Sequence, residues 1–160
     1  MQIIDRGIIF DGASAAPNER SCAFTSATQL RDGALLVAFR LGTGRDTPDG
    51  RLRIMRSRDE GRSWETLQRG MPATVDGIEG NLYSGYFTEL APGRLLGAFV
   101  WVDRSNPALS FVNPETAGVL PMKALLAESA DDGEQWGPFR EVDLGPETGC
   151  SVTGPIFTLP

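Results

Sequence analysis

A twelve-residue segment of this chain occurs twice, and this repeat constrains the fold more than any other feature. Residues 28–39 read TQLRDGALLVAF, and residues 88–99, sixty positions later, read TELAPGRLLGAF without a gap. In each copy apolar runs flank a turn dipeptide, Asp32-Gly33 or Pro92-Gly93. This pattern predicts a strand, a tight turn and a second strand. A repeated supersecondary unit of this length predicts a repeat architecture such as a propeller.

A second pair of matching segments follows each hairpin. Residues 57–64 read SRDEGRSW and residues 129–136 read SADDGEQW, so both fit the motif Ser-x-Asp-x-Gly-x-x-Trp. In such a motif the Asp side chain accepts backbone N–H groups of a turn, Gly permits a positive φ, and Trp packs inward. We therefore expect a structural role for the eight motif residues: Ser57, Asp59, Gly61, Trp64, Ser129, Asp131, Gly133 and Trp136.

Together the hairpin and the motif predict a unit of four short antiparallel strands, which is one propeller blade. Blade one covers about residues 19–68 and blade two about residues 79–144, with twelve extra residues around 102–119. A third blade begins at about 147–160, since residues 150–153 (CSVT) resemble residues 22–25 (CAFT). The sequence thus predicts an all-β propeller of about two and a half blades. We expect the remainder of the propeller, or another chain, to cover the open blade faces.

Two Ser-x-Asp-x-Gly-x-x-Trp motifs at the same point of two units resemble the Asp boxes of the sialidase-like (neuraminidase) superfamily of BNR-repeat propellers. The resemblance covers about residues 19–144. It implies six blades in the full fold and an exo-acting glycosidase that cleaves sialic acid. It also implies that the boxes lie on the face opposite the active site.

On that opposite face we expect the loops between the second and third strands and the segments that precede the first strands. The resemblance places a general-acid Asp in the first such loop, where Asp46 stands, with Asp49 as the fallback. A Phe/Tyr-Arg-Ile-Pro motif in the first blade of the family is absent here, since Ala23 occupies the position of its arginine. The family's nucleophilic Tyr–Glu pair and its remaining arginines belong to later blades. Candidate substrate-binding residues are Arg20, Arg40, Arg45, Glu19, Glu79, Tyr83, Asp103, Arg104 and Glu147.

Glu19, Glu79 and Glu147 share a position, because each precedes the first strand of a unit. The repeat predicts that their carboxylates converge near the propeller axis. Carboxylates brought together there would repel one another unless an arginine, a cation or a polyhydroxylated ligand lay between them. The alternative is three exposed acids in three similar loops.

Composition excludes several classes of chemistry. The chain has no histidine, which excludes Ser-His-Asp and Cys-His nucleophiles and imidazole metal sites. Two cysteines without metal-ligand spacing predict no metal site, and we expect no cofactor. A net charge of −6 with scattered basic residues predicts no nucleic-acid partner. No apolar run suggests a membrane span or a signal peptide, so a cytoplasmic location is the default expectation.

Three functions stay open on the sequence. The Arg- and Asp-rich first loop favours a glycosidase-like enzyme that acts on a carbohydrate. The missing arginine motif favours a non-catalytic propeller that binds a glycan or a protein. The end of the chain within the third blade favours an inactive truncated fragment. For Arg45, Asp46 and Asp49, ordinary solvated turn residues are the alternative to a catalytic loop.

Overall fold

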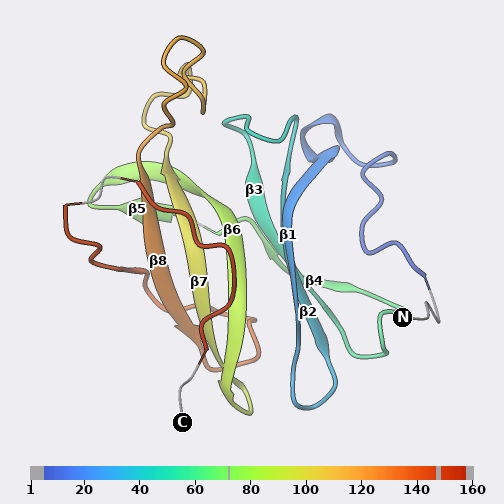
Figure 1. Cartoon of the computed structure of the whole chain (residues 1–160). Coiled ribbons are helices and arrows are strands. Elements are labelled where there is room, and N and C mark those ends of the chain that lie inside the picture. The colour runs from blue at the N-terminus through green and yellow to red at the C-terminus, as the bar shows by residue number, and fades with distance from the viewer. Residues whose placement is uncertain (1–5, 72, 147–148, 158–160) are drawn as a thin grey trace.

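The computed structural model describes residues 6–71, 73–146 and 149–157. In this part of the chain the fold is all-β: two antiparallel sheets lie against each other, and one 3-10 turn, η1 (Pro17–Glu19), precedes them (Figure 1). The prediction of an all-β fold is therefore confirmed, and the two sheets are consistent with part of a β-propeller. The described residues contain no helix of the length and hydrophobicity that a membrane crossing needs.

Sheet A is a simple antiparallel meander of four strands. Its order is β1 (Ser21–Gln29), β2 (Leu35–Gly42), β3 (Arg51–Ser57) and β4 (Glu65–Arg69). The predicted turn lies between β1 and β2, where Gly33 has a φ of 92° and Ala34 N donates to Asp32 Oδ1 at 2.9 Å. Glycine takes this left-handed conformation without steric cost, which explains its place in the turn.

Sheet B repeats this meander and adds one strand, which pairs with the start of β6. Its order is β5 (Ala73–Val75), β6 (Ile78–Ala91), β7 (Arg94–Asp103), β8 (Met122–Ser129) and β9 (Arg140–Glu141). The four-stranded pattern expected from the sequence accounts for β6 to β9 but not for β5. A two-residue turn, Asp76-Gly77, joins β5 to β6, and both residues have positive φ values of 52° and 77°. Such a turn matches the twist of a hairpin, so β5 pairs with the start of β6.

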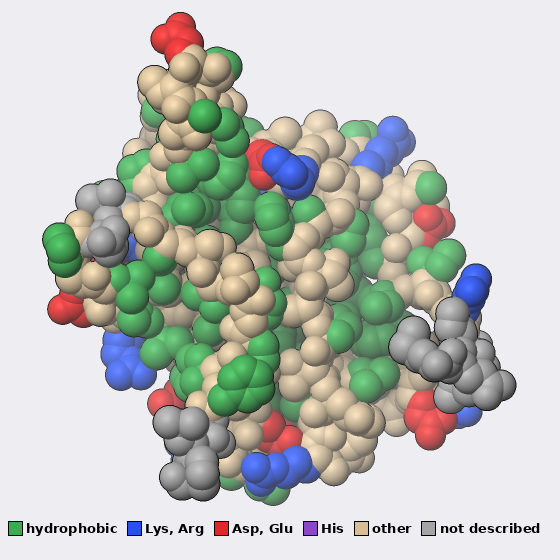
Figure 2. Space-filling model, in the orientation of Figure 1, with side chains coloured by type: hydrophobic (Ala, Val, Ile, Leu, Met, Phe, Trp, Pro, Cys, Tyr) green, Lys and Arg blue, Asp and Glu red, His purple; other side chains and the backbone are tan. Residues whose placement is uncertain are grey.

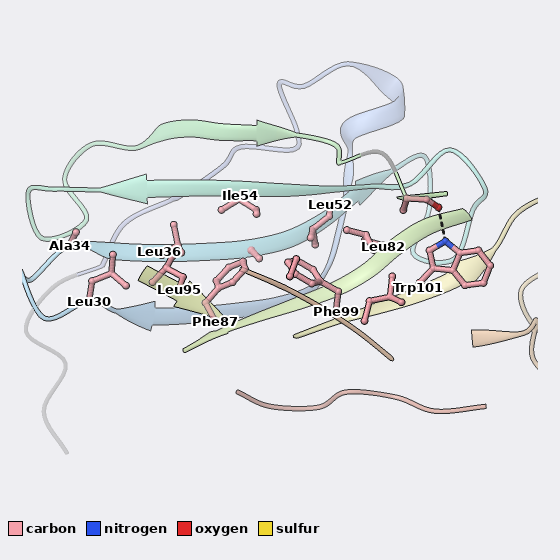
Figure 3. Close-up of a cluster of buried hydrophobic side chains, with 14 residues drawn as sticks. Leu30, Ala34, Leu36, Leu52, Ile54, Leu82, Phe87, Leu95, Phe99 and Trp101 are labelled. Atoms are coloured by element: carbon pink, nitrogen blue, oxygen red, sulfur yellow. Dashed lines mark hydrogen bonds between the residues drawn. The ribbon is translucent and has the colours of Figure 1, made fainter. Parts of the chain in front are cut away.

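The main core lies between the two sheets. Alternate residues of β2, β3, β6 and β7 point into it because successive side chains of a strand face opposite sides of a sheet (Figure 3). Trp101 is fully buried there, and its Nε1 donates to the main-chain oxygen of Ala73 at 2.6 Å. The large side chains of this core that are almost completely buried are Leu36, Leu52, Ile54, Leu82, Phe87, Leu95, Phe99, Trp101 and Leu125.

The two Ser-x-Asp-x-Gly-x-x-Trp motifs form the same turn in both sheets. Ser57 Oγ donates to Asp59 Oδ1 at 2.8 Å, and Ser129 Oγ donates to Asp131 Oδ1 at the same distance. The glycines that follow have φ values of 86° and 87°. Trp64 and Trp136 are both half-buried, each against apolar residues of its own sheet. Each motif follows the third strand of its meander, so it lies at the end opposite the loop between the second and third strands.

Residues 149–157 lie over the face of sheet B that points away from sheet A. The segment alternates between exposed and half-buried residues, and no strand is assigned to this described stretch. Val152 packs against Tyr83, Val100 and Val102, while Thr88 Oγ1 donates to the main-chain oxygen of Ile156 at 2.6 Å. The segment therefore crosses sheet B in extended form, as the C-terminal trace in Figure 1 shows.

Candidate functional site

The loop of residues 43–50 connects β2 to β3 at the end of the sheets opposite the motif turns. The Asp49 carboxylate holds this loop together from within. Its Oδ2 accepts hydrogen bonds from Thr43 N at 3.0 Å and from Thr43 Oγ1 at 2.6 Å, and its Oδ1 accepts one from Thr47 Oγ1. Burial raises the pKa of Asp49, but the hydrogen bonds from Thr43 and Thr47 outweigh it and leave the pKa lowered. The Asp49 carboxylate is thus engaged in holding the loop together.

Arg40 supports the loop from sheet A. It continues the row Leu36–Ala38–Arg40 on β2, which faces sheet B, so its side chain enters the space between the sheets just below the loop. The residue is 1% exposed, and its guanidinium donates to the main-chain oxygens of Arg45 at 2.9 Å and Thr47 at 2.5 Å. Burial lowers the pKa of Arg40, the direction expected for a desolvated cation.

Sheet B holds the same loop from the other side. Tyr83 on β6 donates its hydroxyl hydrogen to the main-chain oxygen of Asp46 at 3.2 Å. Arg104, just after β7, donates to that oxygen at 2.8 Å and also to the Tyr83 hydroxyl. Asn81 Nδ2 donates to the main-chain oxygens of Pro48 and Gly50, both at 2.9 Å. The loop backbone is therefore fixed by side chains from both sheets. We call Arg40, Asn81, Tyr83 and Arg104 the loop clamp.

An aromatic ring lies at the centre of the loop clamp. The guanidinium carbons of Arg40 and Arg104 are 4.3 and 5.6 Å from the ring centroid of Tyr83, within the range of cation–π contacts. Burial raises the pKa of Tyr83, while the two guanidiniums oppose that shift. Phe111, in the insert between β7 and β8, stacks on Tyr83 with ring centroids 4.8 Å apart. The insert, which projects at the upper left of Figures 1 and 2, is thus anchored at its base beside the loop.

The side chain of Asp46 follows the clamped backbone and is 25% exposed. Its Oδ2 accepts the Nε of Arg45 at 2.8 Å and forms an ion pair with Nη2 at 2.7 Å. Its Oδ1 is buried and has no hydrogen-bond partner among the described residues. The structure therefore presents one carboxylate and one largely exposed guanidinium side by side on a rigid loop.

Four other predicted site residues, Glu19, Arg20, Glu79 and Asp103, are not part of the loop clamp. Glu19 is paired with Arg53 on β3, beside a cavity of about 130 Å³. Arg20 is exposed and donates to the main-chain oxygen of Ala15 at 3.4 Å. Glu79 is exposed, and only its main chain touches the clamp, since its oxygen accepts Arg104 N at 2.9 Å.

Asp103 and Glu147 complete the predicted set. Asp103 Oδ1 accepts Ser105 N at 2.8 Å and Ser105 Oγ at 2.7 Å, which builds the first turn of the insert. Glu147 lies outside the described residues. The Glu19 carboxylate forms an ion pair with Arg53 of sheet A. The convergence of the three glutamates on a shared site stays a prediction.

The structure thus brings together Arg40, Arg45, Asp46, Tyr83 and Arg104, all of which were candidates from the sequence. The arginines Arg40 and Arg104 are buried under the loop, and their role as substrate ligands stays a prediction. Sequence reasoning missed Asn81 as a clamp residue. Asparagine is depleted in strands, so an Asn at the start of a strand-like apolar run was the available signal. Phe111 lies in an irregular insert, and no sequence pattern points to it.

One comparison with a solved structure supports the fold. No family model and no curated protein matches the sequence. Among solved structures, the Hadza microbial sialidase Hz136 is similar to 78% of this chain with a TM-score of 0.56 and 15% identity. A protein of unknown function from Dyadobacter fermentans DSM 18053 is similar to 73% of the chain with a TM-score of 0.48 and 19% identity. The chain spans 26% and 35% of the lengths of these two proteins. At this identity the likeness to Hz136 concerns the fold alone: the described sheets are arranged like part of that protein.

Proposed function

We propose that this chain is part of a sialidase-like Asp-box propeller that acts on glycans from the loop face, as an exo-acting glycoside hydrolase or a relative of one. The observation that carries the proposal is Asp46, a partly exposed carboxylate on a loop whose backbone is clamped from two sheets. Catalytic groups must be held in a fixed geometry by their surroundings, and the loop clamp supplies that rigidity. The resemblance to sialidases supports glycans that carry sialic acid as the ligand class.

In the proposed reaction Asp46 is the general acid. It transfers its proton to the oxygen of the leaving group as the bond between that oxygen and the anomeric carbon breaks. The anomeric carbon bonds to the nucleophile as the leaving group departs, and a water molecule then breaks that bond. The hydroxyl group of the water stays on the anomeric carbon, and its remaining proton restores Asp46, which acts as the base in this second step. By resemblance, a Tyr–Glu nucleophile and further arginines come from later blades, which we propose cover the open faces of the described sheets in the same or another chain. Asp49 serves the loop rather than the reaction, because its two oxygens already accept three hydrogen bonds.

A non-catalytic glycan-binding propeller is the second candidate, and one contact favours it. A general acid must face the leaving group, whereas the carboxylate of Asp46 is held by Arg45 at 2.7 Å. The same pair of groups would suit the hydroxyl and carboxylate groups of a sugar that is bound and not cleaved, since guanidinium groups bind carboxylates bidentately. An inactive fragment is the third candidate.

One experiment separates the three candidates. The propeller that this chain forms together with the blades that complete it is mixed with 3′-sialyllactose and with lactose, and both binding and release of free sialic acid are measured. Cleavage that falls about 100-fold or more in Asp46→Asn supports the enzyme. The control Asp143→Asn, an exposed residue outside the loop, should leave cleavage unchanged. Binding without cleavage supports the binding propeller, and the absence of both overturns a glycan function for this chain.

A further inference from the structure

Phe24 has a backbone conformation that its residue type disfavours. It lies within β1 with a φ of 55°, in a bulge where the register between β1 and β2 shifts from Ala23 to Ser26. Left-handed φ values are uncommon for residues other than glycine, and for a bulky side chain they are genuine outliers. The other described non-glycine residues with positive φ, Glu60, Asp76, Ala117 and Asp132, all lie in turns or loops outside the strands.

The strain at Phe24 is not matched by deep burial of its side chain. The residue is 39% exposed, and among the large apolar residues of the described strands only Ile78, at 38%, is similarly exposed. An aromatic ring that served the core would be expected among the buried residues. A strained backbone conformation persists only where the surrounding structure enforces it. Such conformations are concentrated at active sites and ligand-binding sites.

Phe24 is also the accessible end of an aromatic cluster that reaches the loop clamp. Its ring centroid is 5.5 Å from that of Tyr83, which in turn stacks on Phe111 at 4.8 Å. Tyr83 is buried and Phe111 half-buried, so Phe24 offers the most open ring of the three. The three rings come from β1, β6 and the insert, and the Tyr83 hydroxyl is bonded to the main chain of Asp46.

We propose that Phe24, backed by Tyr83 and Phe111, is an aromatic platform on which a sugar ring of the ligand stacks. One face of a pyranose ring is lined by C–H groups, and binding sites combine such apolar contact with a few placed polar groups. The exposed Arg45 guanidinium and the Asp46 carboxylate would supply the polar groups, because they belong to the loop whose main chain Tyr83 contacts. This inference rests on the proposed glycan function, and it assigns the residue that recognises the sugar face.

The test uses variants of Phe24 that separate the effect of its strained backbone from the effect of its ring on sugar binding. Phe24→Gly removes the ring and also relieves the positive φ, while Phe24→Leu removes the ring and keeps an apolar side chain. Phe24→Tyr keeps the ring. Glu60→Gly is the matched control, because it relieves a φ of 60° in the turn of the first motif, at the opposite end of sheet A. Thermal melting is measured for each variant, and binding of 3′-sialyllactose and of lactose is measured by calorimetry.

We expect Phe24→Gly to melt no lower than the wild type and to bind 3′-sialyllactose about tenfold more weakly, the effect of losing one aromatic contact. Phe24→Leu should weaken binding to a similar extent, whereas Phe24→Tyr and Glu60→Gly should bind as the wild type does. If Phe24→Gly melts lower, the ring also stabilises the fold and Phe24→Leu decides: weaker binding supports the platform, and unchanged binding overturns it. A wild-type chain that binds neither sugar overturns it as well.

The platform and the proposed function can fail separately. Cleavage that survives Asp46→Asn removes Asp46 from its proposed role and leaves the platform standing. Unchanged sugar binding in both Phe24→Gly and Phe24→Leu removes the platform and leaves the role of Asp46 standing.

Discussion

Thr28 and Phe87 join the first strands of the two meanders directly, because the Thr28 hydroxyl donates to the main-chain oxygen of Phe87 at 3.1 Å. Thr88 stands sixty residues after Thr28 at the matching position of the repeat, and it donates to the main-chain oxygen of Ile156 at 2.6 Å. The same contact thus recurs between sheet B and residues 149–157. This recurrence favours the interpretation of that segment as the first strand of a third unit.

The Thr28 contact should contribute measurably to stability. Thr28→Val keeps the shape of the side chain and removes the donor, so the Phe87 oxygen loses a partner in a partly buried place. We expect the free energy of unfolding to fall by about 1 kcal/mol in urea titrations. Thr74→Val, at an exposed position of β5, is the control and should be near neutral. Equal stability of Thr28→Val and the wild type would contradict the proposed link between the strands.

The first motif turn should give the fold a specific pH dependence. Hydrogen bonds from the Ser63 hydroxyl and amide, and from Ser57, lower the pKa of Asp59 from 3.8 to about 2. In the unfolded chain Asp59 takes up a proton near its ordinary pKa, whereas in the folded chain it stays ionised. Its stabilisation is therefore complete above about pH 4 and is lost as the pH falls toward 2.

Denaturant titrations between pH 5 and pH 2 test this dependence. The unfolding midpoint of the wild type should fall more steeply over this interval than that of Asp59→Asn. The lowered pKa of Asp131, which arises first from its hydrogen bond with the Gln135 amide, predicts the same direction for Asp131→Asn. Parallel curves for the wild type and Asp59→Asn would show that Asp59 has an ordinary pKa in the folded chain.

Gly50 makes room for the loop clamp. A Cβ atom at this buried position would overlap the guanidinium of Arg40, which is itself held by the loop carbonyls. Gly50→Ala should therefore displace Arg40, lower the free energy of unfolding by about 1–3 kcal/mol and speed amide exchange in residues 43–50. Gly7→Ala, which adds a Cβ into open space, should change neither quantity. Unchanged exchange in Gly50→Ala would mean that Arg40 does not fix the loop.

The strands were predictable where a turn dipeptide flanked by apolar runs also occurs in both copies of the repeat. The Asp32-Gly33 turn with apolar runs on both sides specifies the β1–β2 hairpin, and its copy specifies β6–β7. The Asp76-Gly77 dipeptide between Val75 and Ile78 carried an equally strong hairpin signal for β5. It was missed because a four-stranded unit left no place for an additional strand.

The site was harder to predict, because its key features depend on contacts between the two sheets. The alternation along β2 places Arg40 beside Leu36 and Ala38, but only the loop carbonyls explain how a guanidinium is tolerated in that row. A buried cation needs such partners, and they come from a separate segment. The bulge that exposes Phe24 likewise has no sequence signal, since a Phe within a strand is otherwise an ordinary core residue.

The most direct test of the account is to map where a glycan binds. Backbone amide shifts of the labelled chain are followed by NMR during titration with 3′-sialyllactose. We predict that the shifts concentrate in residues 43–50 and around Phe24 and Arg104, with little change at Gly61 and Gly133 in the motif turns. Shifts that concentrate at the motif turns, or that fail to appear in residues 43–50, would contradict the assignment of the ligand site to the loop face around Asp46.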